Sequence, residues 1–135
     1  VHGIGSDRVL NESDVVKVDV GIETPAGWIG DNAKTIPVGK ISADAEALLA
    51  ATEASLFAAI DCAREGELLS KLCGSVEAHV APLGFTVVKQ FVGHGVGRQH
   101  HEEPQVTNYW DEEEKRNRRV KNTRLQAGMV LAIEP

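Results

Sequence analysis

The sequence has few cysteines and no long apolar run. Its two cysteines, Cys62 and Cys73, do not form a C-x-x-C pair. This pattern fits buried, reduced thiols in a cytosolic protein better than a disulfide scaffold or a zinc knuckle. The sequence also has no signal-peptide pattern and no apolar stretch of bilayer length. We therefore expect a soluble, cytoplasmic protein that does not associate with membranes.

Basic residues are in the minority. Fourteen lysines and arginines stand against twenty acidic residues, which gives a net charge of −6 at pH 7. A protein that reads nucleic acid normally presents a broad basic face, so this balance argues against direct nucleic-acid readout. At 135 residues, the chain is long enough to form one domain with a hydrophobic core.

The most informative stretch places a histidine between two glycines. His94 lies between Gly93 and Gly95, directly after the apolar run at 85–92, which predicts a strand. Flanking glycines let the backbone turn sharply and approach a ligand closely. We therefore predict that His94 is presented at a strand end as a metal ligand. A second pair of imidazoles follows shortly, in the segment HHEEP at 100–104.

Three carboxylates stand in otherwise apolar surroundings. Asp19 lies inside a β-branched run, Asp31 follows the segment GWIG, and Glu134 ends the apolar run at 129–133. A carboxylate is costly to bury unless it is paired or bound to a cation. Asp19 and Glu134, each taken alone, have an alternative interpretation as edge-strand charges that oppose aggregation. Together with His94, three carboxylates that we expect to be buried indicate an oxygen-rich site for one or two divalent metals.

The first half of the chain predicts a hairpin followed by a helix. Strands are expected at 15–21 and 33–38, joined by a turn at 24–27, as an antiparallel hairpin. Ser42 is a suitable helix N-cap, and the helix should end at Gly66. Apolar residues recur along it at helical spacing, namely Leu49, Leu56, Ile60 and Ala63.

A second helix is expected over 68–83, closed by Gly84. Its predicted buried stripe consists of Leu69, Leu72, Val76, Val80 and Leu83. The polar segment at 105–126 predicts a long loop before the last strand.

Five segments of this chain resemble the signature segments of one enzyme family. They are VHGIG at 1–5, VKVDVG at 16–21, GWIGDNAKTIPVGK at 27–40, GHGVGRQHHEEPQV at 93–106 and AGMVLAIEP at 127–135. Their order and spacing are similar to those of the type I methionine aminopeptidases, which are "pita-bread" metallopeptidases. The resemblance implies an α/β (α+β) pita-bread sheet with helices on its outer face and metals in its concave face. Residues 1–135 would form a single, partial catalytic domain.

The chain begins at Val1 without methionine and stops at Pro135. From the resemblance we expect it to be the middle of a longer protein, in which a further glutamate beyond Pro135 bridges the metals.

The resemblance also implies roles for individual residues. Asp19 would chelate one metal, Asp31 would bridge two, and His94 with Glu134 would hold the second. The ions would be two divalent cations, either cobalt, manganese, iron or zinc. Glu134 would also carry a proton to the leaving amine.

Histidines would serve on the substrate side. His101 and His2 would donate hydrogen bonds to the scissile amide and its tetrahedral intermediate. An exposed loop histidine is the alternative for His101. His100 and His79 have no counterpart in the resemblance, and we expect them to be structural or exposed.

The function implied is a metal-dependent aminopeptidase that removes the initiator methionine from new proteins and peptides. Its partners would be the N-terminus of a peptide or nascent chain and the ribosome, and the complete protein would be a monomer. Two alternatives remain open: a prolidase-like Xaa-Pro peptidase of the same fold, and a non-catalytic pita-bread binding module. The segment HEEPQV at 101–106 is closer to the methionine enzymes.

Overall fold

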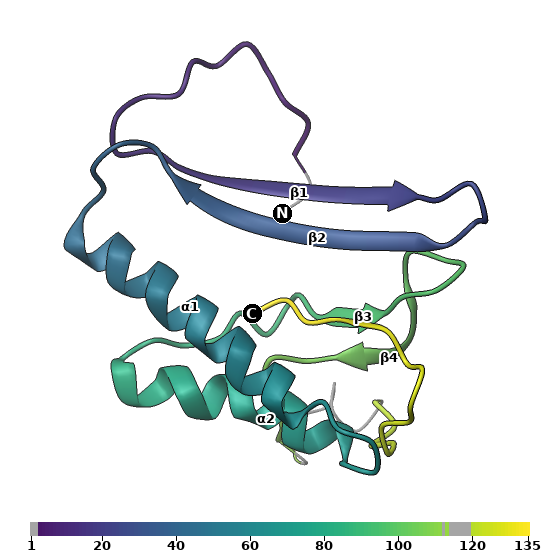
Figure 1. The fold of residues 1–135 in the computed structure, drawn as a ribbon. Coiled ribbons are helices and arrows are strands. Elements are labelled where there is room, and N and C mark those ends of the chain that lie inside the picture. Colours follow the sequence, from purple (N-terminus) through teal and green to yellow (C-terminus); the bar gives the residue numbers. More distant parts are fainter. Residues whose placement is uncertain (1–2, 112, 114–119) are drawn as a thin grey trace.

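The computed structural model describes residues 3–111, 113 and 120–135. Figure 1 shows a two-stranded hairpin on one side of the molecule, with a pair of helices and a small sheet on the other. The elements in chain order are β1 (Val15–Glu23), β2 (Ile29–Pro37), α1 (Ala43–Cys62), α2 (Leu69–Val80), a 3₁₀ turn (Ala81–Leu83), β3 (Gly93–Gly95), β4 (Glu102–Val106) and β5 (Leu131–Ala132). The three-stranded sheet has the order β4-β3-β5 and is antiparallel. Among the described residues, no helix has the length and apolar character needed to cross a membrane.

The β1–β2 hairpin confirms the sequence prediction and is longer than expected. Its pairing runs from Val15 opposite Pro37 to Glu23 opposite Ile29. The connecting turn is closed by a hydrogen bond from the amide of Gly27 to the carbonyl of Thr24, 2.8 Å long. Gly27 has a φ of 75°, a conformation that favours glycine.

The hairpin register places two of the predicted ligands on one face. Asp19 lies opposite Ala33, and Asp31 lies opposite Gly21. Because directly paired residues and residues two apart along a strand share a face, Asp19 and Asp31 are on the same side of the hairpin.

The helix α1 begins where the sequence indicates but buries a different face. The Ser42 hydroxyl accepts a hydrogen bond from the amide of Ala45 at 3.2 Å, which confirms the N-cap. None of the apolar residues at helical spacing, Leu49, Leu56, Ile60 and Ala63, is fully buried, and Ile60 is 45% exposed. The buried residues are instead Ala51, Ser55 and Ala59. Small side chains let two helices approach closely, and Ala59 joins the core formed by residues of α2.

The helix α2 carries most of the core. Four members of its predicted stripe are buried, but Leu83 is 56% exposed. The chain tightens into a 3₁₀ turn after Val80, and three residues per turn instead of 3.6 rotate Leu83 away from the stripe. Gly84 ends this turn with a φ of 83°. The hydrophobic core consists of Ala59, Leu69, Leu72, Cys73, Val76, Val106, Val120 and Leu125.

The predicted strand at 85–92 is wrong, because only Gly93–Gly95 pairs as β3. No neighbouring strand within the described residues pairs with 85–92. Two of its large apolar side chains are also exposed, with Val88 58% and Phe91 53% exposed. An apolar run becomes a strand only where a partner completes its backbone hydrogen bonds.

The last part of the chain also differs from expectation. The loop expected over 105–126 begins later, because β4 includes Gln105 and Val106. The residues that follow are Thr107, Asn108 and Tyr109, and all three are buried. The predicted last strand is short, with only Leu131 and Ala132 paired to β3.

Candidate metal centre

His94 lies at the centre of the three-stranded sheet. Its side chain is buried, and β3 has β4 on one side and β5 on the other. A Cβ atom added to Gly93 would collide with the carbonyl oxygen of Ala132, and one added to Gly95 would collide with that of Glu103. The flanking glycines are therefore needed for the close approach of three backbones around His94.

The orientation of the His94 ring is fixed by a backbone contact. Nδ1 lies 2.9 Å from the carbonyl oxygen of Gly95. A carbonyl only accepts hydrogen bonds, so Nδ1 carries the proton and donates it. In the neutral ring, Nε2 then carries the lone pair, which is the arrangement that suits an imidazole ligand of a metal.

Two carboxylates converge on this free nitrogen. Nε2 of His94 lies 3.5 Å from Oδ2 of Asp31 and 3.3 Å from Oε1 of Glu134. The three residues come from β3, from β2 and from just after β5, and their donor atoms all lie within 4.8 Å of one another. Two ligands of one divalent ion, each about 2.1 Å from it, lie roughly 3.0–3.4 Å apart. The spacing of these side chains therefore fits a shared divalent cation.

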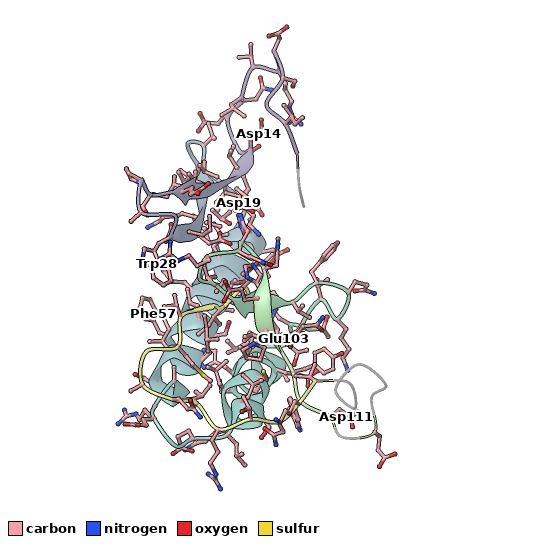
Figure 2. The ribbon with its side chains drawn as sticks, turned by 90° about the vertical axis from the view of Figure 1, so that its right-hand side faces the viewer. Asp14, Asp19, Trp28, Phe57, Glu103 and Asp111 are labelled. Atoms are coloured by element: carbon pink, nitrogen blue, oxygen red, sulfur yellow. The ribbon has the colours of Figure 1, made fainter. Side chains whose placement is uncertain are left out.

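The expectation that all three carboxylates are buried is wrong. Asp31 is largely covered, with a side chain 11% exposed, but that of Glu134 is 39% exposed and Asp19 is exposed. All three line an open cavity of about 670 Å³ between the hairpin, α1 and the C-terminal segment. A carboxylate next to open solvent keeps much of its hydration, so Asp19 and Glu134 avoid most of the cost of desolvation. Figure 2 shows Asp19 on the hairpin, well above Phe57 of α1.

The structure groups three histidines and places His79 elsewhere. His101, predicted on the substrate side, lies beside His94 with ring centroids 4.2 Å apart. His100 also belongs to this group, because the donor atoms of His94, His100 and His101 lie within 4.8 Å of one another. His79 lies in the last turn of α2. His2 lies outside the described residues.

Sequence reasoning missed the role of His100. Nε2 of His100 donates a hydrogen bond to Oδ2 of Asp31 at 2.8 Å. It therefore contacts the same oxygen that faces His94. The signal available in the sequence was Gly21, a glycine inside a β-branched strand, which often marks the close approach of another segment.

The segment 97–101 docks on the hairpin. The amide of Ile29 donates to the carbonyl of Gly97 at 2.9 Å. The guanidinium of Arg98 stacks over the Trp28 ring at 4.3 Å from its centroid and donates to the carbonyl of Ala26. These contacts hold the hairpin, and hence Asp31, against the sheet that carries His94.

The position of Glu134 depends on a buried amide. The Asn108 side chain donates to the backbone carbonyl of Glu134. Asn108 is 4% exposed and follows β4 closely in the chain, so it ties the C-terminal segment to that edge of the sheet. No local pattern around Asn108 indicates this role.

Comparison with known proteins agrees with this geometry. Residues 1–135 match the model of metallopeptidase family M24. The chain belongs to this family. It is 43% identical over its whole length to methionine aminopeptidase 1 of Bacillus subtilis and 39% identical to a methionine aminopeptidase of Helicobacter pylori, of which it covers 51% and 52%. The chain thus spans about half the length of these relatives.

Solved structures show the same fold. The methionine aminopeptidase of Rickettsia prowazekii has a TM-score of 0.86 at 26% identity, with 98% of this chain and 50% of that chain covered. The methionine aminopeptidase of Thermotoga maritima has a TM-score of 0.83 at 35% identity, with 94% and 48% covered. A prolidase of Pyrococcus furiosus has a TM-score of 0.81 at 25% identity, with 98% and 36% covered. The chain therefore has the pita-bread fold of M24 and contains about half of it.

The donor set suits a member of a metallopeptidase family. One imidazole and two carboxylates form a mixed nitrogen and oxygen set, which takes divalent ions such as manganese, iron, cobalt and zinc. Within the described part of the chain, the ion-pair partners of Asp31 and Glu134 are histidines, so no lysine or arginine competes with a cation there.

Proposed function

We propose that the full-length protein containing this chain is a divalent-metal-dependent aminopeptidase that removes N-terminal methionine from new proteins and peptides. The convergence of Asp31, Glu134 and His94 on one point carries this proposal. The similarity to methionine aminopeptidases over the whole chain supports the substrate class. The protein would act in the cytoplasm as a monomer, on nascent N-termini near the ribosome.

Four residues would hold the metal ions. His94 would contribute Nε2, and Asp31 and Glu134 would contribute carboxylate oxygens. Asp19 would complete the set from the same face of the hairpin. When bound, such ions would polarise a carbonyl and lower the pKa of a coordinated water.

The remaining chemistry would come from side chains around the cavity. Glu134, which is partly exposed to the cavity, would carry a proton to the leaving amine. His101, stacked close to His94, would donate a hydrogen bond to the oxygen that becomes negative in the tetrahedral intermediate. We assign the same substrate-side role to His2.

The Xaa-Pro peptidase is the alternative. The two curated relatives are methionine aminopeptidases at 39–43% identity, whereas the prolidase structure is 25% identical. A pair of peptides decides between them: Met-Ala-Ser should be cleaved after methionine, and Ala-Pro should be left intact.

The decisive variant is Asp31→Asn in the full-length protein. It removes the negative charge at the point where the ligand atoms meet but keeps the size of the side chain. We expect methionine release to fall by at least about 100-fold together with metal content, because a ligand is lost. Asp111→Asn, an exposed aspartate after β4, is the matched control and should retain full activity. Near-normal turnover by Asp31→Asn with saturating metal would contradict the proposal.

A further inference from the structure

Next to the metal centre lies one histidine, His100, to which the proposed mechanism gives no role. His100 stacks on His101 with ring centroids 4.8 Å apart and an interplanar angle of 22°, and its ring lies 5.9 Å from that of His94. Its side chain is 45% exposed, so it is not held in place by the core. The position of this ring must therefore come from specific contacts.

The first contact is with strand β1, at a gap in its row of side chains that we call the notch. Gly21 lies opposite Asp31 in the hairpin register. A Cβ atom added to Gly21 would lie 2.5 Å from Cε1 of His100 and 3.2 Å from Nδ1. The missing side chain at Gly21 thus provides the space that the His100 ring occupies.

The second contact is the hydrogen bond from Nε2 of His100 to Asp31, across the same pair of strands. Because the notch holds the ring and Asp31 holds its nitrogen, His100 faces the metal centre from the hairpin side. His94 faces it from the sheet. The nitrogens of both rings and of His101 lie close enough together for one ion.

We propose that His94, His100 and His101 form an imidazole-rich side of the metal centre, which binds borderline divalent ions such as Ni²⁺, Cu²⁺ and Zn²⁺ in preference to Mn²⁺. Imidazole suits these ions, whereas Mn²⁺ prefers carboxylates and water. The inference rests on the proposed metal centre, because His94 belongs to both donor sets.

Sharing of His94 has a geometric consequence. Nδ1 of His94 is occupied by the carbonyl of Gly95, so only Nε2 is available. An ion on Nε2 of His94 can take its other ligands from Asp31 and Glu134, or from His100 and His101 once Nε2 of His100 has given up its proton and its hydrogen bond to Asp31. The relative strength of the two sides then decides which metals the protein retains.

The test compares two metals in the full-length protein by titration calorimetry. His100→Leu replaces the imidazole with an apolar side chain of similar bulk. We expect its Ni²⁺ affinity to fall by at least about 10-fold and its Mn²⁺ affinity by less than about 3-fold. His79→Leu, which alters a histidine in α2, is the control and should change neither affinity.

Gly21→Ala is a second, independent variant. It displaces the His100 ring from the notch without removing any imidazole, and it should give the same selective loss of Ni²⁺. Gly30→Ala is its matched control in the same hairpin, because a Cβ there meets the Ile22 side chain at 3.3 Å and not His100. If His100→Leu fails to fold by circular dichroism, Gly21→Ala decides the question.

Electron paramagnetic resonance of the Cu²⁺-loaded protein supplies a direct readout. The wild-type spectrum should show coupling to three imidazole nitrogens, and His100→Leu should show two. Parallel losses of Ni²⁺ and Mn²⁺ would overturn the proposal, because His100 would then act only by holding Asp31. Unchanged Ni²⁺ binding would also overturn it. Neither result would affect the proposed function, which Asp31→Asn tests by methionine release.

Discussion

The hairpin and the helical pair differ sharply in how much of their apolar surface is covered. On β1, Val18 is 44%, Val20 48% and Ile22 59% exposed, whereas Leu69 and Leu72 of α2 are both fully buried. The hairpin therefore contributes little burial to stability and is held mainly by its own hydrogen bonds and by the docked segment 97–101. Yet it carries two of the proposed metal ligands, Asp19 and Asp31. Stability and assembly of the site thus depend on separate parts of this chain.

The largest loss of stability is expected from a substitution in the helical pair, α1 and α2. Leu72→Ala should lower the free energy of unfolding by about 2–5 kcal/mol, because it leaves a cavity in the core around α2. Leu83→Ala, on the exposed 3₁₀ turn, should lower it by less than about 0.5 kcal/mol. Urea unfolding followed by circular dichroism measures both. Similar losses in the two variants would show that the helical pair is not the main source of stability.

A smaller loss of stability, together with a loss of metal affinity, is expected where the segment 97–101 contacts the hairpin. Arg98→Ala removes the stacking on Trp28 and the hydrogen bond to the turn, so Asp31 should be held less firmly near His94. We expect Mn²⁺ affinity, measured by titration calorimetry, to fall by roughly 10-fold. The loss of one exposed cation–π contact should lower the free energy of unfolding by only about 0.5–1 kcal/mol.

Arg8→Ala is the control for this variant. Arg8 forms an exposed ion pair with Asp14 before the hairpin, and its loss should leave metal affinity unchanged. If metal affinity and stability fell in proportion across Arg98→Ala and Leu72→Ala, the two regions would not be separable.

The smallest effect on stability is expected from an ion pair at the surface near α2. A hydrogen bond from Lys71, together with its charge, lowers the pKa of Glu67 below the ordinary value of 4.5. Because the folded-state pKa is the lower one, this pair stabilises the protein above about pH 4.5, and the contribution disappears as the pH falls through the lowered pKa.

Glu67→Gln should therefore be slightly less stable than the wild type at pH 7. The difference in urea midpoint should be small, since exposed pairs contribute little. It should vanish in acid, because Glu67 is then protonated and carries no charge for Lys71 to pair with. Glu65→Gln, a neighbouring exposed residue, should show no such change with pH. A difference for Glu67→Gln that grew on acidification would mean that the pKa of Glu67 is raised by folding and not lowered.

Local patterns in the sequence predicted the elements that depend on neighbouring residues. The alternation and turn around Thr24 predicted the hairpin, and Ser42 predicted the start of α1. The strand at 85–92 could not be judged in this way, because strand formation depends on a partner elsewhere. The buried face of α1 was also missed, since close contact with α2 favours small residues such as Ala59 over the larger apolar ones.

The site was predictable in part for the same reason. Asp31, His94 and Glu134 stand out as polar residues beside glycines or apolar runs, and the structure brings them together. Asp19 lies on the same face of the hairpin but is not in that group of donor atoms. His100 and Asn108 act through contacts with residues far away in the sequence. Gly21 marks the place where another segment approaches but does not identify His100, and no local pattern identifies Asn108.

Strand β3 limits how much variation this region tolerates. Within Gly93–Gly95, only His94 carries a side chain, and the backbones on both sides leave no room for even a methyl group at the other two positions. In a saturation library, substitutions at all three positions should inactivate the protein, but for different reasons. Side chains at Gly93 and Gly95 would clash with the neighbouring backbones, and replacement of His94 would remove a metal ligand. Redesign of the centre is thus restricted to residues outside β3 whose side chains meet solvent, such as Asp19 on the hairpin and His100 in the segment 97–101.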